Sequence, residues 1–166
     1  MRFVLVPLCF TLLHAQENNK EENKEDFPSV VTKQDTVTIA GRKIDYKVTA
    51  STLSLKTAKD EDRASIFHVA YERIGMGDRH KRPILFAFNG GPGSSAVWLH
   101  MGALGPRIVP TTPDGTKTLP PPLTVKENPQ SILDVADIVF IDPVSTGFSR
   151  AEGKTKADEF HGVNGD

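Results

Sequence analysis

The sequence has almost no cysteine. Its 166 residues contain a single one, Cys9, which lies inside an apolar run at the N-terminus. If that run is cleaved off, no thiol remains, which excludes a disulfide framework, a cysteine-ligated zinc site and a cysteine nucleophile. Cys9 also comes too early to anchor a lipid, and Pro7-Leu8 stand before it where small residues would be needed.

Long apolar runs and an excess of one charge are lacking as well. No run reaches the roughly 18 residues that a bilayer-spanning helix needs, so no stable membrane insertion is expected. The chain has 20 basic and 21 acidic residues and a net charge of −1. This balance does not resemble the concentrated basic surface of a nucleic-acid-binding protein. A length of 166 residues fits one domain or part of one.

The first 34 residues differ from the rest of the chain. Residues 1–15 combine a positive start, an almost wholly apolar stretch and a small residue at Ala15, the layout of a secretory signal peptide. A buried or membrane-associated N-terminal helix is the alternative. Residues 16–34 begin with a charged segment without apolar residues and are interpreted as a disordered linker. Export to the periplasm or the extracellular space is therefore expected, with a folded domain over residues 35–166.

Alternating apolar residues predict the strands. Residues 36–39 and 44–48 alternate on either side of a turn, which indicates an antiparallel hairpin, and residues 65–74 indicate a third strand. The short apolar runs 83–88 and 136–141 are typical of strands buried on both faces, so Phe86 is expected in the core.

A helix is expected between these two buried runs. Over residues 94–104 the apolar side chains have helical spacing, Trp98 is expected in the core, and Ser94 or Ser95 is expected to cap the start. This order of elements is compatible with a mixed α/β sheet.

The segment FNGGPGSS, residues 88–95, carries the chemistry. Its glycines let the backbone approach a ligand closely. Amides at a helix start favour an anion, either a phosphate or the oxyanion of acyl transfer. Phosphate is the weaker candidate, because no lysine follows the glycines and Pro92 lacks an amide. On this local pattern alone, a glycine turn without any ligand stays equally open.

Two long blocks resemble the serine carboxypeptidases, peptidase family S10. Residues 82–109 (RPILFAFNGGPGSSAVWLHMGALGPRIV) resemble the family's N-G-G-P-G-[CS]-S-S block. Residues 128–150, which end in DVADIVFIDPVSTGFSR, resemble its N-P-x-S…D-x-P-x-G-T-G-[FY]-S stretch. The resemblance covers roughly residues 66–164. The scarcity of cysteine and the segment HMGALGP are similar to the bacterial-type branch of the family.

The resemblance implies a fold and site roles. The fold would be α/β, the N-terminal half of an α/β-hydrolase, with a mixed, mostly parallel sheet that starts with an antiparallel hairpin. The amide of Gly91 would be an oxyanion donor, and Asn89 and Gly90 would hold the C-terminal carboxylate of a peptide substrate. No cofactor and no metal are implied. The loop bordering the site would comprise Asp142, Pro143, Ser145, Thr146, Gly147, Phe148 and Ser149.

Three positions depart from the family's pattern. Ala87 stands where a tryptophan is usual, and Ser145 stands where a glycine is usual. Ala103 lies near the position of a glutamate that belongs to a carboxyl pair for the substrate carboxylate. The resemblance therefore does not predict an acidic pH preference for this protein.

The catalytic triad is not expected within these residues. No G-x-S-x-G elbow occurs in the chain, and the family's nucleophile follows the second block. Ser149 lies in the near-match GFSRA, but Pro143 ends the strand too early, so Ser149 is expected to hydrogen-bond within its loop. Asp142 is expected to order its own turn. His68, His80, His100 and His161 are interpreted as structural or exposed.

The sequence thus predicts a serine-type carboxypeptidase that releases C-terminal residues through an acyl-enzyme, with this chain an inactive fragment that lacks the nucleophile. The partner would be a peptide with a free C-terminus. Two alternatives remain: a truncated homologue that only binds, or another α/β-hydrolase such as an esterase or acyltransferase. The sequence does not indicate side-chain specificity or oligomeric state.

Overall fold

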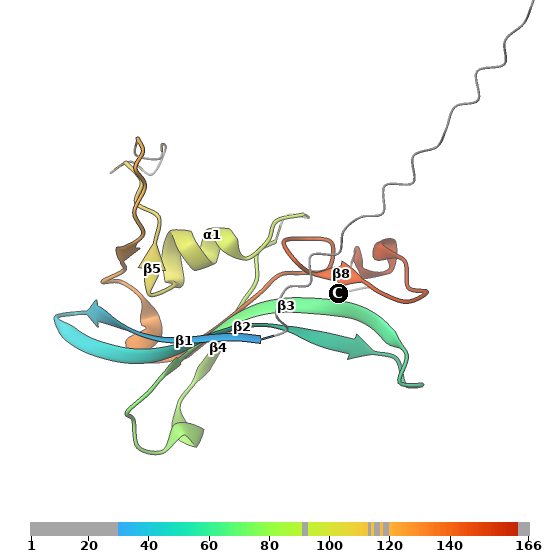
Figure 1. The fold of residues 1–166 in the computed structure, drawn as a ribbon, viewed down its shortest axis with the longest axis horizontal. Coiled ribbons are helices and arrows are strands. Elements are labelled where there is room, and N and C mark those ends of the chain that lie inside the picture. Colours follow the sequence, from blue (N-terminus) through green and yellow to red (C-terminus); the bar gives the residue numbers. More distant parts are fainter. Residues whose placement is uncertain (1–29, 91–92, 113, 115–116, 118–119, 163–166) are drawn as a thin grey trace, which may run out of the picture.

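A computed structural model describes residues 30–90, 93–112, 114, 117 and 120–162. The expected signal peptide and Gly91 lie outside these residues, as does the linker up to residue 29. The described part is built on a curved sheet with the strand order β1-β2-β3-β7-β4, and β8 also pairs with β3 (Figure 1). A short helical segment lies over one face of this sheet, next to a small two-stranded sheet formed by β5 and β6.

The strands differ widely in length. They are β1 Val30–Ile39, β2 Arg42–Lys56, β3 Asp62–Arg73, β4 Ile84–Ala87, β5 Arg107–Ile108, β6 Lys126–Glu127, β7 Asp137–Ile141 and β8 Arg150–Ala151. The helical elements are short: η1 Arg79–Lys81, α1 Val97–Leu99, the π-helix η2 His100–Leu104, η3 Ile132–Asp134 and η4 Ala157–Phe160. Among the described residues, no helix has the length and apolar character required to cross a membrane.

The hairpin of β1 and β2 is confirmed, with Val37 paired to Ile44. Its two-residue turn has φ values of +48° at Ala40 and +75° at Gly41. Positive φ at both central residues is typical of the tight turns that connect the two strands of a hairpin. The strand begins at Val30, five residues before the expected start of the domain. The alternation of apolar and polar residues did not predict this extension, because the extension has no buried face: Val30 is 57% exposed. Main-chain pairing with β2 holds it in the sheet.

The mixed sheet is confirmed, but the expectation of mostly parallel strands is not met in the described residues. β2 pairs antiparallel with β1 and β3, and β3 pairs antiparallel with β7. Only β4 and β7 are parallel. Short turns join β1 to β2 and β2 to β3, whereas the parallel pair needs a long crossover, which here runs from residue 88 to residue 136.

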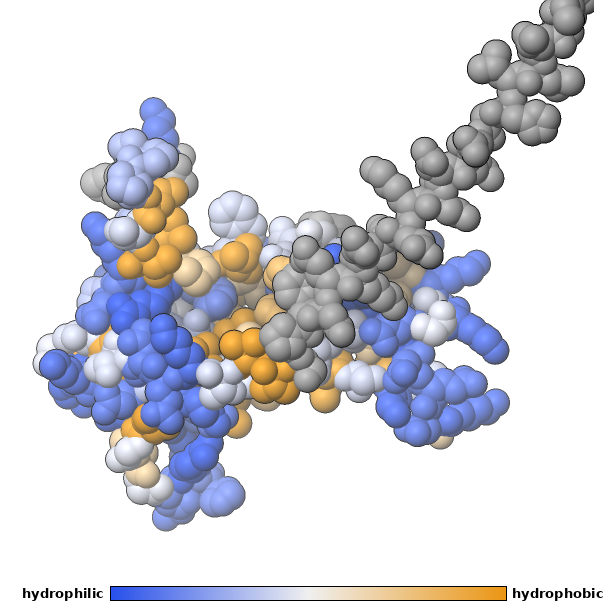
Figure 2. Space-filling model, viewed as in Figure 1, coloured by the Kyte–Doolittle hydropathy of each residue, from blue (hydrophilic) through white to orange (hydrophobic). Residues whose placement is uncertain are grey.

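One face of the sheet forms the core. Alternate residues of the strands point to this face, and the helical segment and η3 cover it. Its buried members are Val37, Ile39, Ile44, Tyr46, Tyr71, Ala87, Ala96, Leu133, Ile138 and Phe140. Apolar side chains gather over the middle of the molecule, between hydrophilic ends (Figure 2).

The opposite face is open at β4, so burial on both faces was a wrong prediction there. Ile84 is 58% exposed and Phe86 59% exposed, although Ala87 on the core face is buried. Trp98 is 70% exposed, which also contradicts its expected place in the core. The exposure of Ile84 and Phe86 follows from the position of β4 at the edge of the described sheet, where described segments cover only one of its faces.

Candidate functional site

The parallel pairing of β4 and β7 brings the two sequence motifs together. Ala87 at the end of β4 lies opposite Phe140 of β7. Because the carboxyl ends of parallel strands meet at the same edge of a sheet, the loop that starts at Phe88 and the loop that starts at Asp142 leave the sheet side by side. Ligands of open α/β sheets commonly bind at such an edge.

Asn89 and Gly90 follow β4 and present polar groups that have no partner among the described residues. Asn89 is half-buried, and no hydrogen bond joins its side chain to another residue in the described part of the chain. Gly90 is exposed, and a Cβ added there would meet nothing within 4 Å. These two residues therefore offer an amide side chain and a main-chain amide to a ligand. The proposed oxyanion donor Gly91 lies outside the described residues, so its role stays a prediction.

The helix after the loop starts later than expected. Its first residue is Val97, its N-cap residue is Ala96, and no side chain at the cap residue bonds the helix start. The expected capping by Ser94 or Ser95 is therefore wrong. Instead, the carboxylate of Asp142 accepts a hydrogen bond from the Ala96 amide at 2.9 Å. This partner is distant in sequence, so a local capping pattern could not reveal it.

Residues at the start of the second motif bind the C-terminal end of the same helical segment. Asn128 is 3% exposed and its side-chain amide donates to the carbonyls of Ala103 at 2.7 Å and Gly105 at 2.8 Å. The hydroxyl of Ser131 donates to the carbonyl of Leu104 at 2.8 Å. Sequence reasoning found this motif but missed its task, which is to satisfy carbonyls at a helix C-terminus.

The loop that follows β7 is folded on itself. The main-chain amide and the hydroxyl of Thr146 both donate to the carbonyl of Pro143, at 3.0 and 2.8 Å. The Ser149 amide donates to the Thr146 carbonyl, and the Ser145 amide donates to the Ser149 carbonyl. Phe148 is 61% exposed at the tip and its ring contacts that of Phe67 edge-on. These bonds give the loop one defined path beside the Asn89 segment.

Ser149 is committed to this loop. It is fully buried, its hydroxyl donates to the carbonyl of Asp142 at 2.7 Å, and it accepts from the Phe67 amide at 2.8 Å. The hydrogen bonding expected of Ser149 is therefore present. A serine nucleophile needs an accessible hydroxyl beside a base, and the Ser149 hydroxyl faces main-chain groups instead.

Ser145 is strained where the family's pattern has glycine. Its φ is +72°, in the left-handed region that L side chains rarely adopt. We expect Ser145→Gly to raise the free energy of unfolding by about 0.5 to 1 kcal/mol, since relief of the Cβ clash exceeds the extra entropy of glycine in the unfolded chain. Urea unfolding measures this change. Ser65→Gly in β3, where φ is ordinary, is the control and should destabilise; a destabilised Ser145→Gly would contradict the strain.

His100 is a packing residue next to the site. Its Nε2 lies 2.6 Å from the hydroxyl of Tyr71, and its ring stacks on Phe140 with centroids 4.6 Å apart. Burial lowers the pKa of His100 to about 4, although the charge of Asp142 acts in the opposite direction. Burial also raises the pKa of Tyr71. Both side chains are therefore neutral at ordinary pH, in line with a structural interpretation of this histidine.

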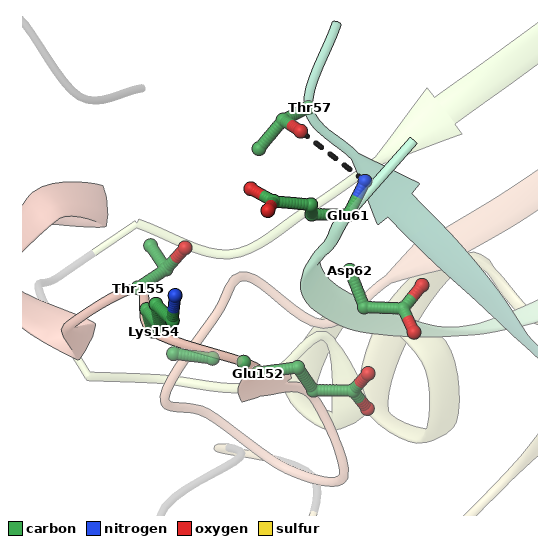
Figure 3. A pocket seen from close by; sticks show the side chains of 8 residues that line it. Thr57, Glu61, Asp62, Glu152, Lys154 and Thr155 are labelled. Carbon is green, nitrogen blue, oxygen red and sulfur yellow. Dashed lines mark hydrogen bonds between the residues drawn. The ribbon is translucent and has the colours of Figure 1, made fainter. Parts of the chain in front are cut away.

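A hollow of about 620 Å³ lies between the β2–β3 turn and residues 151–155 (Figure 3). Within it, the Thr57 hydroxyl accepts from the Glu61 amide at 3.3 Å. Its lining is Thr57, Glu61, Asp62, Ala151, Glu152, Gly153, Lys154 and Thr155. None of these is a candidate site residue. In the described ranges, no group of three or more histidine, cysteine or acidic side chains is placed to hold a metal ion.

Comparisons with known proteins point to one family. The family model described as serine carboxypeptidase matches residues 48–162, which include both loops of the candidate site. A solved structure of Kex1Δp, a prohormone-processing carboxypeptidase from Saccharomyces cerevisiae, is 26% identical over 65% of this chain, with a TM-score of 0.48. The match covers 21% of the Kex1Δp chain. No curated protein matches the chain.

Proposed function

Because the chain belongs to the serine carboxypeptidase family, we propose that it supplies the anion-binding part of a site that removes C-terminal residues from peptides. The family is one of hydrolases that act on peptides, and the mixed sheet would be part of a larger hydrolase fold. The chain spans about a fifth of the length of Kex1Δp, at 21%. The activity proposed here is therefore that of the whole protein.

One observation carries the proposal: an amide side chain and a main-chain amide stand without described partners where two family loops meet. Asn89 and Gly90 supply these groups. Amide N–H donors suit a carboxylate, because an ionised carboxylate only accepts hydrogen bonds. A site built around them favours peptides with a free C-terminus, since an internal peptide bond offers no carboxylate.

The neighbouring glycine serves the chemical step. Attack of a serine hydroxyl on the scissile carbonyl places negative charge on its oxygen, and the Gly91 amide would stabilise that oxyanion before the C-terminal residue leaves. The serine nucleophile, its histidine base and the orienting acid would come from outside these residues. Ser149 is unsuited to the role, because its buried hydroxyl already bonds two main-chain groups. This chain alone would then be inactive.

The proposal includes export. The apolar run after Met1-Arg2 would direct the protein to the periplasm or the extracellular space and would be cleaved near Ala15. The charged segment that follows would serve as a linker to the folded part.

The product of the complete gene tests this function with three substrates: an N-blocked dipeptide, its C-terminal amide and its ester. We expect kcat/KM for the free acid to exceed that for the amide by roughly 100-fold. With the amide substrate, a donor of Asn89 or Gly90 would lose its carboxylate acceptor, and an unpaired donor in a binding site is costly. Asn89→Ala should reduce this ratio mainly through a higher KM for the acid.

Three outcomes would count against the proposal. Equal kcat/KM for the acid and the amide would mean that the carboxylate is not recognised. Cleavage of the ester alone would indicate an esterase. An unchanged ratio in Asn89→Ala would remove the assigned role of Asn89.

A further inference from the structure

The carboxylate of Asp142 joins the two loops of the candidate site. Its Oδ1 accepts from the Ala96 amide at 2.9 Å, and its Oδ2 accepts from the Phe148 amide at 3.3 Å. Ala96 belongs to the first loop and Phe148 to the second. Asp142 is only 8% exposed, so water does not compete freely for either bond. The sequence-based expectation that Asp142 orders its own turn accounts for the bond from Phe148, but not for the bond from Ala96.

The main chain of Asp142 is itself fixed to the sheet. Its amide donates to the carbonyl of Phe67 at 3.0 Å, and its carbonyl accepts from the Ser149 hydroxyl at 2.7 Å. Phe67 lies in β3, a strand paired on both sides. The carboxylate therefore extends from a rigid point, and whatever it binds is held at a set position relative to the sheet.

The Asp142 carboxylate fits between the two loops only because residue 147 has no side chain. A Cβ on Gly147 would lie 1.8 Å from Oδ2 of Asp142 and 3.1 Å from Cβ of Ser95. Only a glycine at position 147 lets the second loop pass this close to the carboxylate and to the first loop. The glycine and the aspartate thus depend on each other.

The first loop depends on Asp142 for its attachment at one end. At its other end the loop is held by the pairing of Ala87 with Phe140. The N-cap residue Ala96 has no side-chain cap bond of its own. Asn128 and Ser131 hold the far end of the helical segment, beyond the loop. Release of the Ala96 amide would therefore detach the end of this loop from the second loop.

We propose that Asp142 is a positioning residue that fixes the direction in which the Asn89 side chain and the Gly90 amide point, and hence the preference for a free C-terminal carboxylate. The proposal rests on the proposed function. Asp142 itself touches neither substrate nor reacting atoms; it acts through Ala96. Its replacement should therefore change how well the site distinguishes an acid from an amide, beyond any change in stability.

The variant Asp142→Asn tests this in the product of the complete gene. Asparagine has the same shape, but its NH2 group replaces one of the two oxygens, so either the Ala96 amide or the Phe148 amide would face a donor. We expect the acid-to-amide ratio of kcat/KM to fall about tenfold, because small displacements of binding groups weaken selective contacts. The ratio is independent of how much of the variant is folded, since both substrates meet the same active molecules.

Ser131→Ala is the matched control. It removes a buried hydrogen bond to the same helical segment, but at the far end, where Leu104 is the partner, together with the cap bond from the Leu133 amide at 3.4 Å. We expect a lower melting temperature and an unchanged ratio. A ratio in Asp142→Asn within twofold of the wild-type value, or an equal fall in Ser131→Ala, would overturn the positioning role. A wild-type protein that does not distinguish acid from amide would instead refute the proposed function.

Hydrogen exchange on the wild-type protein decides the matter if Asp142→Asn does not fold. The Ala96 amide should exchange slowly without any ligand, because the Asp142 carboxylate already holds it. Addition of an N-blocked dipeptide product with a free carboxylate should slow exchange at Gly90 and leave Ala96 as it was. An Ala96 amide protected only when the dipeptide is present would show that the ligand orders the loop, and the proposal would fall.

Discussion

Replacing Gly147 by alanine is expected to cost about 3 to 5 kcal/mol in the free energy of unfolding, from a left-handed backbone penalty and the displacement of a buried, hydrogen-bonded carboxylate. The φ of Gly147 is +46°, and the new methyl carbon would lie 1.8 Å from Oδ2 and 2.5 Å from Cγ of Asp142. Asp142 cannot yield without giving up its bonds to Ala96 and Phe148. Urea unfolding of the protein measures the change.

A second glycine separates the two causes. Gly75 has a φ of +75° and a Cβ there would meet nothing within 4 Å. Gly75→Ala should therefore cost only about 1 kcal/mol, the backbone penalty alone. An equal loss in the free energy of unfolding in the two variants would show that Asp142 moves aside without cost. The close contact between Asp142 and Gly147 would then not contribute to stability.

The second large effect is expected at Arg82, where Arg82→Met should destabilise the protein by about 3 to 5 kcal/mol, because it leaves a buried charge uncompensated. The side chains of Arg82 and Asp137 are 7% and 14% exposed, and the Nε–Oδ1 distance is 2.7 Å. Arg82 also donates to the carbonyls of Leu133 and Asp134. One guanidinium thus ties the start of β4 to η3 and to the start of β7.

The same substitution at an exposed ion pair is the control. Arg42 bonds Asp134 at 3.2 Å, but its side chain is 65% exposed. Arg42→Met should cost less than about 1 kcal/mol, the usual value of a surface pair. A double variant, Arg82→Met with Asp137→Leu, should recover part of the loss, because no buried charge is then left unpaired. A loss at Arg82 as small as that at Arg42 would refute the role of the buried pair.

The strands were largely predictable, whereas their environment was not. Alternation in residues 36–39 and 44–48 identified the hairpin, and apolar runs identified β4 and β7. The same runs suggested burial on both faces, yet Phe86 is 59% exposed. Apolar character shows that a side chain favours burial, but not whether another segment is present to cover it.

The candidate site was predictable as two loops, but not as one assembly. The motifs located Asn89 and the loop from Asp142 to Ser149, and the parallel pair of β4 and β7 brings both to one edge. The bond from Ala96 to Asp142 joins residues 46 positions apart. Asn128 bonds carbonyls 23 and 25 positions away. Short-range patterns do not predict such contacts, because these depend on the whole chain path.

The parallel pair of β4 and β7 also has a consequence for how the molecule forms. The β1–β2 hairpin and the β2–β3 pair join neighbours along the chain and close short loops, so we expect them to form early in folding. The β4–β7 pair must first close the long crossover, whose entropy cost is met only once distant contacts exist. The edge that carries Asn89 and Asp142 should therefore be among the last regions to form, together with the part of the core that β4 and β7 supply, and slow closure of the crossover would delay binding competence.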